Sequence, residues 1–123
     1  MSERRPVVLL VDDEAHILSA LQRTLRREGY ELLARTSPSE ALRVLAARAV
    51  DVVVSDQKMP GGSGIELLRE IAARQPSTKR VLLTGWPEEV PERERAAARL
   101  DAILPKPWDE EALKATLRRC VSR

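Results

Sequence analysis

Short apolar runs alternate along the chain with segments in which apolar residues recur at helical spacing. Most of the runs are β-branched and aliphatic, as in strands that are buried on both faces of a sheet. The pattern predicts strands over residues 7–11, 31–35, 51–56, 80–83 and 102–104. It predicts helices over residues 15–29, from 38, from 63, over 88–100 and from 109.

Residues at the expected helix ends support these assignments. Ser37 and Ser63 are each followed three positions later by a glutamate, the capping-box pattern. Asp109 can cap the last helix, and Gly29 is a typical stop for the first. Strict alternation of buried strands and helices implies right-handed crossovers and a mostly parallel sheet covered on both faces. We therefore expect an α/β fold, a doubly wound sandwich formed by residues 1–123 as one domain.

Composition and charge restrict the class of protein. Of the 123 residues, 43% are hydrophobic and 33% charged, which allows a core without disulfides or a structural metal. The 21 basic and 19 acidic residues are interspersed and only 2% are aromatic, so neither a DNA-binding stripe nor a stacking platform for single strands is expected. A single cysteine, Cys120, fits a reducing compartment, and we expect neither a signal peptide nor a membrane span. The expectation is a cytoplasmic protein with no direct nucleic acid partner and no membrane partner.

Polar residues of related chemistry follow four of the expected strands. They are Asp12 and Asp13 after the first strand, Asp56 at the end of the third, Thr84 after the fourth and Lys106 after the fifth. In doubly wound sheets the ligand site lies beyond the carboxyl ends of the strands, where the strand order reverses. We therefore expect these side chains to converge.

Three carboxylates in one shallow pocket repel one another unless a cation is bound. Oxygen ligands suit a hard ion such as Mg²⁺, which usually keeps waters or phosphate oxygens in its other coordination positions. This indicates phosphoryl chemistry, in which Lys106 offers a positive charge and Thr84 a hydrogen-bond donor.

The same residues, with the short motifs around them, resemble the receiver domains of two-component response regulators. The motifs are Asp-Asp at 12–13, Asp-x-x-Met-Pro-Gly at 56–61, Thr-Gly at 84–85 and Lys-Pro at 106–107. They occur in the order of that family from one end of the chain to the other. The resemblance implies a (βα)5 flavodoxin-like sandwich with strand order 2-1-3-4-5.

The resemblance also implies a role for each residue of the site. Asp56 would be the phosphoacceptor, forming an acyl phosphate. Asp13 would bind Mg²⁺ directly and Asp12 mainly through water, with Asp56 and the backbone carbonyl of Lys58 as further ligands. Lys106 would pair with the phosphoryl group, and a cis peptide bond after Lys106 would turn its side chain toward the site.

Activation is expected to act through Thr84. The phosphoryl group would draw Thr84 toward it and alter the surface of the fourth helix, fifth strand and fifth helix. A sensor histidine kinase would supply the phosphoryl group, and an output domain or downstream effector would respond. A phosphorylation-dependent homodimer is a further expected state. The protein would not be a dedicated enzyme, although it would catalyse its own phosphotransfer and autodephosphorylation.

The chain departs from the family pattern at several positions. Ile103 stands where many members carry Tyr or Phe, so Thr84 is expected to signal through its loop and the fourth helix. Lys58 and Trp86 occupy variable positions beside the acyl phosphate that influence the access of water. Arg-Leu at 99–100 replaces a customary Gly-Ala, which favours a more helical turn.

Two other classes of function stay open. One is a Mg²⁺-dependent phosphatase with an aspartyl nucleophile, although such enzymes usually carry a second acid two residues after the nucleophile, where this chain has Lys58. The other is a receiver-like interaction module that is not phosphorylated. The complete set of acids, threonine and lysine argues against that module.

Overall fold

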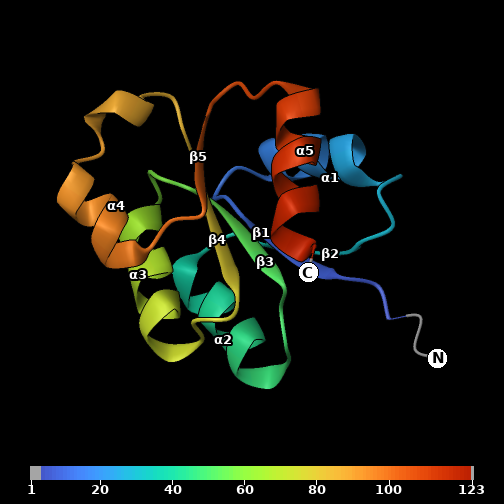
Figure 1. Cartoon of the computed structure of the whole chain (residues 1–123), viewed down its shortest axis with the longest axis horizontal. Coiled ribbons are helices and arrows are strands. Elements are labelled where there is room, and N and C mark those ends of the chain that lie inside the picture. The colour runs from blue at the N-terminus through green and yellow to red at the C-terminus, as the bar shows by residue number, and fades with distance from the viewer. Residues whose placement is uncertain (1–3, 123) are drawn as a thin grey trace.

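The computed structural model describes residues 4–122, in which strands and helices alternate as predicted (Figure 1). The strands are β1 (Val7–Val11), β2 (Glu31–Arg35), β3 (Val52–Asp56), β4 (Lys79–Thr84) and β5 (Ala102–Pro105). The helices are α1 (Ala15–Leu25), α2 (Pro38–Ala47), α3 (Gly64–Arg74), α4 (Glu92–Ala98) and α5 (Glu110–Val121), with a 3₁₀ turn, η1 (Pro87–Glu89), before α4. None of these helices is long and apolar enough to cross a membrane.

All the strands run parallel in a five-stranded sheet of order β2-β1-β3-β4-β5. Every residue of β1 and β3 is buried, which explains why both strands show runs without an exposed polar position. The strand bounds differ from those predicted by at most one residue at either end. The doubly wound α/β sandwich and its strand order are thus confirmed, and the order reverses between β1 and β3.

Helices cover both faces of the sheet (Figure 1). On one face Leu18, Leu21 and Leu25 of α1 join Leu113 and Leu117 of α5 against the sheet. On the other face α2, α3 and α4 pack over the sheet with the buried side chains Ala41, Val44, Leu45, Ile65, Leu67, Leu68, Ile71 and Ala98. The core is therefore almost entirely aliphatic, with Tyr30 as its one buried aromatic side chain among residues 4–122, as the shortage of aromatic residues predicts.

Side-chain caps begin three of the helices. Ser63 Oγ accepts from the Glu66 N–H at 3.2 Å and Glu66 Oε1 accepts from the Ser63 N–H at 2.9 Å, a complete capping box. Ser37 caps α2 by accepting from the Glu40 N–H at 3.2 Å. The Glu40 carboxylate accepts from the N–H of Thr36, the residue before Ser37, and not from the N–H of Ser37 itself. Only half of the predicted capping box therefore forms at α2. Asp109 accepts from a backbone N–H of α5 at 2.8 Å, as expected.

The first helix ends a turn earlier than predicted. α1 ends at Leu25, residues 26–29 form a turn, and Gly29 adopts a φ of +85°. Leu25 is buried, whereas Arg26 and Arg27 are exposed, so a longer helix would place no further apolar side chain in the core.

The fourth helix, expected over residues 88–100, is shorter and interrupted. Pro91 has no N–H and disfavours helical geometry in the residue before it. Val90 is accordingly extended, with φ −86° and ψ 114°, and separates η1 from α4. α4 then spans only seven residues, with Pro91 at its N-cap.

The end of α4 also differs from the prediction. Arg99 adopts left-handed geometry, with φ 47° and ψ 55°, and ends the helix, so the expected helical turn at 99–100 is wrong. The Arg80 side chain, only 5% exposed, donates from Nε to the carbonyls of Ala98 at 3.0 Å and Arg99 at 3.2 Å. A buried cation at the C-terminal end of a helix stabilises that end. Nothing in the sequence indicates this contact, because Arg80 is expected there only as the first residue of a strand.

Candidate functional site

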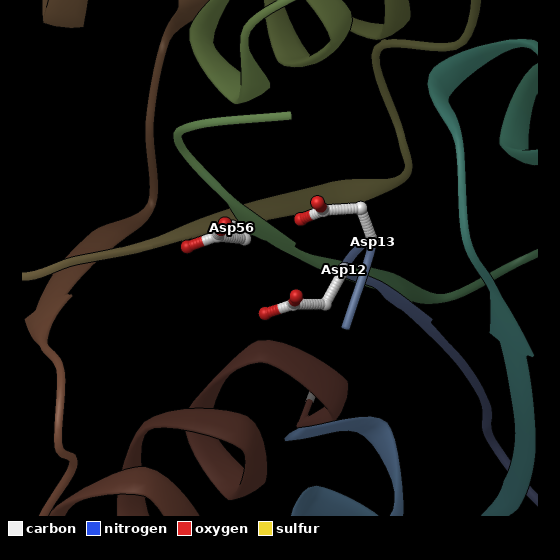
Figure 2. Close-up of side chains that lie close together, drawn as sticks. All are labelled: Asp12, Asp13 and Asp56. Atoms are coloured by element: carbon white, nitrogen blue, oxygen red, sulfur yellow. The ribbon is translucent and has the colours of Figure 1, made fainter. Parts of the chain in front are cut away.

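Three carboxylates lie together at the carboxyl ends of β1 and β3 (Figure 2). Asp12 directly follows β1, Asp56 is the last residue of β3, and the two strands are neighbours in the sheet. Asp12, Asp13 and Asp56 each offer a carboxylate oxygen, and these oxygens lie within 4.8 Å of one another. Asp12 is fully buried and Asp56 is 8% exposed, whereas Asp13 is exposed. The acids that we expected to converge do so, with Asp13 on the solvent side.

Lys106 joins the two buried acids. Its Nζ donates to Asp56 Oδ1 at 2.8 Å and to Asp12 Oδ2 at 3.0 Å. The peptide bond from Lys106 to Pro107 is cis, as the resemblance implies. The Lys106 N–H donates to the Thr84 carbonyl at 2.9 Å, which attaches the loop after β5 to the end of β4.

Burial and neighbouring charges set the ionisation of this pair. Burial raises the pKa of Asp56, and the hydrogen bond from Lys106 lowers it. The negative charge of Asp12 raises it, so that the pKa of Asp56 is raised overall. Burial lowers the pKa of Lys106, but its hydrogen bonds to Asp56 and Asp12, together with the negative charges of these two acids, outweigh burial and raise the pKa overall. Lys106 therefore stays charged, and this single ammonium contacts two of the three carboxyl groups of the cluster.

The donor set fits a hard divalent cation such as Mg²⁺, because it consists of carboxylate oxygens alone. Both oxygens of Asp12 already accept hydrogen bonds, Oδ1 from the Glu14 N–H at 2.9 Å and Oδ2 from Lys106. The exposed Asp13 is therefore better placed than Asp12 for direct contact with an ion. Lys58 lines the same pocket, and the use of its carbonyl as a ligand stays a prediction.

The backbone of Asp56 is held against the start of α3 by Gly64 and Gln57, two residues outside the set expected from the sequence. A Cβ on Gly64 would lie 2.1 Å from the Asp56 carbonyl oxygen, so only glycine fits this contact. The Gln57 carbonyl accepts from the Gly64 N–H at 2.8 Å, and Gln57 Oε1 accepts from the Ile65 N–H at 2.9 Å. In the sequence, the only local indication of this close contact is that glycine occupies the first position of a helix that begins with a capping box.

Residues from the loops after β3 and β4 form the mouth of the site. Thr84, 5% exposed, accepts at Oγ1 from the Trp86 N–H at 3.2 Å. Lys58 Nζ lies 4.7 Å from the centroid of the Trp86 ring, within the range of a cation–π interaction. The cavity measures about 410 Å³ and is lined by Asp13, Glu14, Asp56, Gln57, Lys58, Thr84, Gly85, Trp86 and Lys106.

Trp108 and His16 are not part of this pocket. Trp108 lines a groove between α1 and α5, where its Nε1 donates to Thr24 Oγ1 at 3.4 Å. His16 is exposed on α1. Of the two tryptophans, Trp86 therefore lies in a position to respond directly to ligands at the acid cluster.

Comparison of the sequence with known families and curated proteins identifies relatives along nearly the whole chain. The profile of the response regulator receiver domain family matches residues 8–118. The chain is 37% identical over 123 residues to the hydrogenase transcriptional regulatory protein HoxA of Cupriavidus necator. The aligned region covers 98% of this chain and 25% of HoxA. The chain thus spans about a quarter of the length of this relative.

Solved structures show the same similarity. The signal receiver domain of an HD domain-containing protein from Pseudomonas fluorescens Pf-5 superposes with a TM-score of 0.87 at 37% identity, covering 96% of this chain and 95% of that chain. The response regulator TrrA of Thermotoga maritima, in complex with Mg²⁺ and BeF, superposes with a TM-score of 0.86 at 30% identity, covering 94% and 99%.

Proposed function

Since this chain belongs to the response regulator receiver domains of two-component systems, a family of phosphorylation-based switches, we propose that it accepts a phosphoryl group on Asp56. Receiver domains interact with sensor histidine kinases, and the donor is a phosphohistidine of such a kinase. A carboxylate oxygen of Asp56 attacks phosphorus, the P–O bond forms as the P–N bond breaks, and the imidazole leaves. The product is an acyl phosphate on Asp56.

The contact between Lys106 and Asp56 carries this assignment. Lys106 Nζ donates to Asp56 at 2.8 Å, and Asp56 lines the open pocket. Asp12 also contacts Lys106, but it is fully buried and both of its oxygens already accept hydrogen bonds. Asp56 is thus the acid that combines access to a donor with an adjacent positive charge.

The other residues of the site stabilise the phosphoryl group. Lys106 pairs with its oxygens, and the Thr84 hydroxyl donates a hydrogen bond to one of them. Asp13, Asp56 and the Lys58 carbonyl would hold Mg²⁺ directly and Asp12 would hold it through water, and the bound ion would supply further charge neutralisation. The TrrA complex supports the binding of Mg²⁺ by similarity, because that protein of the same fold was solved with Mg²⁺ and BeF.

Incubation of the protein with Mg²⁺ and acetyl phosphate, followed by measurement of the intact mass, tests the proposal. Here the P–O bond to acetate breaks, and acetate is the leaving group. A gain of one phosphate supports the proposal, and an unchanged mass contradicts it.

The phosphoryl group is also removed at this site. Water attacks phosphorus, the bond to the Asp56 carboxylate breaks, and inorganic phosphate leaves, so the chain catalyses its own dephosphorylation. While phosphorylated, it presents an altered surface of α4, β5 and α5 to an output domain or a downstream effector. A transcriptional output is suggested by HoxA, which is named as a transcriptional regulatory protein. Phosphorylation-dependent homodimerisation is a further state that we propose.

Mg²⁺ should stabilise the folded protein without any phosphodonor, because it relieves repulsion among three carboxylates. A ligand that binds only the folded state at a hundredfold excess over its Kd adds about 2.7 kcal/mol to the free energy of unfolding. Thermal unfolding should show this stabilisation as a higher Tm.

The gain in Tm on adding Mg²⁺ should shrink in Asp13→Asn. It should be kept in Asp109→Asn, which removes the same charge at the α5 cap. Because the pKa of Asp56 is raised, the gain should also fall as the pH is lowered and this carboxylate becomes protonated. An equal Tm gain in Asp13→Asn and the wild type would exclude Asp13 as a ligand.

Hydrogen exchange should change most in residues 85–104 when Mg²⁺ and beryllofluoride bind. α4 buries only Ala98, whereas α1 buries Leu18, Leu21 and Leu25. At about 25 cal/mol per Å² of apolar surface, the missing side chains remove several kcal/mol of anchoring from α4, which therefore opens more readily. Exchange mass spectrometry should show α1 unchanged beyond the acid pair. Identical exchange of residues 85–104 in both states would place the responsive surface elsewhere.

A further inference from the structure

Trp86 and Lys58 form a contact across the mouth of the phosphoacceptor pocket. Lys58 belongs to the loop after β3 and Trp86 to the loop after β4, and both line the pocket that contains Asp56. The ammonium of Lys58 lies 4.7 Å from the centre of the Trp86 ring. Among the large hydrophobic side chains of residues 4–122, Trp86 is the exposed one, at 51%. An exposed indole held by a flexible cation is free to move without disturbing the core.

Trp86 is held on its backbone side by Thr84, the residue expected to respond to a phosphoryl group. The Trp86 N–H donates to Thr84 Oγ1 at 3.2 Å. A hydroxyl can accept one hydrogen bond and donate another at the same time, so Thr84 can bind a phosphoryl oxygen while it still holds Trp86. Movement of the Thr84 side chain is therefore transmitted to the Trp86 backbone through this hydrogen bond. η1 begins at the next residue, Pro87, and α4 follows, so Trp86 is the first residue of the segment that leads into α4.

The Lys58 ammonium has a weaker hold on its partner than the other lysine of the site. Lys106 is shared by Asp12 and Asp56, whereas no ion pair joins Lys58 to a carboxylate within residues 4–122. An exposed cation–π contact changes an equilibrium constant by only about two- to fivefold. A phosphoryl group adds roughly 1.5 to 2 negative charges and strong acceptor oxygens to the same pocket. The lysine ammonium is a compact charge on a flexible stem and can turn from the ring to these oxygens.

We propose that Lys58 and Trp86 form a latch that phosphorylation opens, and that Trp86 is the aromatic residue that signals occupancy of the site. Before phosphorylation, Lys58 holds the Trp86 ring across the pocket. Afterwards, the Lys58 ammonium turns to the phosphoryl oxygens while Thr84 draws the Trp86 backbone inward, and the released ring changes the path of the segment that enters α4. Position 103 holds the half-buried aliphatic Ile103, so β5 supplies no ring at that position. This inference rests on the proposed phosphorylation of Asp56.

The latch can be observed through the fluorescence of Trp86. The chain has two tryptophans, and Trp108→Phe leaves Trp86 as the only one. In this background, saturating Mg²⁺ and beryllofluoride should increase the quenching of Trp86 by acrylamide and shift its emission to the red, because the ring leaves the lysine for solvent. Occupancy is measured separately by ¹⁹F NMR of the bound beryllofluoride. Trp86→Phe leaves Trp108, in the groove between α1 and α5, as a matched control whose emission should not change.

Variants of Lys58 separate the latch from other causes of movement. Lys58→Met and Lys58→Gln remove the cation, so the ring should be released before any ligand binds, with the equilibrium moved about two- to fivefold toward the released form. At equal beryllofluoride occupancy the fluorescence response should then be lost. Lys58→Arg keeps the cation and should keep the response.

The outcomes distinguish the latch from the function on which it rests. If wild-type protein binds no beryllofluoride and gains no phosphate, the proposed function is wrong. If beryllofluoride binds and the quenching of Trp86 does not change, the latch is wrong and the proposed function stands. The latch is also wrong if Lys58→Met and Lys58→Gln respond as fully as Lys58→Arg.

Discussion

Asp56→Asn should completely abolish the gain of one phosphate on incubation with Mg²⁺ and acetyl phosphate. An amide oxygen is a poor nucleophile and carries no charge, so the variant cannot form the acyl phosphate. The substitution keeps the size of the side chain and one oxygen that can accept from Lys106 Nζ, which lies 2.8 Å from the present carboxylate. We expect a folded protein with an unchanged mass, and intact-mass spectrometry over a time course measures the effect.

The matched control for this experiment is Asp109→Asn. Asp109 caps α5 outside the pocket, and asparagine is a comparable N-cap residue, so this variant loses one carboxylate and should keep both fold and phosphate uptake. Asp13→Asn should take up phosphate more slowly, because it weakens Mg²⁺ binding while leaving the nucleophile in place. A full phosphate gain in Asp56→Asn would show that another residue is the acceptor.

Gly64→Ala should strongly destabilise the fold, although alanine is the better helix former. In the middle of a helix alanine is favoured over glycine by about 0.5–1 kcal/mol, so propensity does not disfavour alanine in α3. The added Cβ would lie 2.1 Å from the Asp56 carbonyl oxygen and 2.9 Å from Leu82 Cδ1, so α3 must shift away from β3. We expect a loss of about 3 kcal/mol in the free energy of unfolding, the upper end of the usual range for an overpacked site. Denaturant titration measures this loss.

Gly85→Ala is the matched control for the glycine substitution. The nearest atom to a Cβ at Gly85 is the Lys106 carbonyl oxygen at 3.8 Å, an ordinary van der Waals contact. This variant should unfold within about 1 kcal/mol of the wild type, a difference typical of substitutions that neither overpack nor leave a cavity. Equal stability of the two variants would mean that α3 can move away from Asp56 without cost, which would remove Gly64 from the set of residues that position the acceptor.

Much of the fold could be predicted from the sequence, because its main features are set by simple physical requirements. A strand buried on both faces, such as β1 or β3, admits few polar residues, so both stand out as apolar runs that end in acids. Alternation with amphipathic helices restricts the topology to a parallel, doubly wound sheet. The carboxyl ends of parallel strands then meet at one edge, which brings Asp12, Asp56 and Lys106 together without further information.

The bounds of α4 could not be predicted in the same way. Its sequence is rich in alanine, arginine and glutamate, and a helix that buries only Ala98 shows little amphipathic pattern. Pro91 was visible in the sequence as a residue near the start, but the extended Val90 before it was not expected. The C-terminal end depends on Arg80, whose guanidinium reaches the last carbonyls of the helix from another element. Such a contact leaves no periodic signal in either segment.

The sequence alone therefore specifies which chemical groups occupy the strand ends, since the position of a residue relative to a buried strand is a local property. The exact distances within the site depend on the packing of elements that are remote in the sequence. Gly64 meets the carbonyl of Asp56 because α3 packs closely against β3, and Lys58 reaches the Trp86 ring because two separate loops end at the same edge of the sheet. Hydrophobic periodicity records which face of an element is buried, but it does not record which atom lies opposite. Contacts of this kind become visible only when the whole chain is folded.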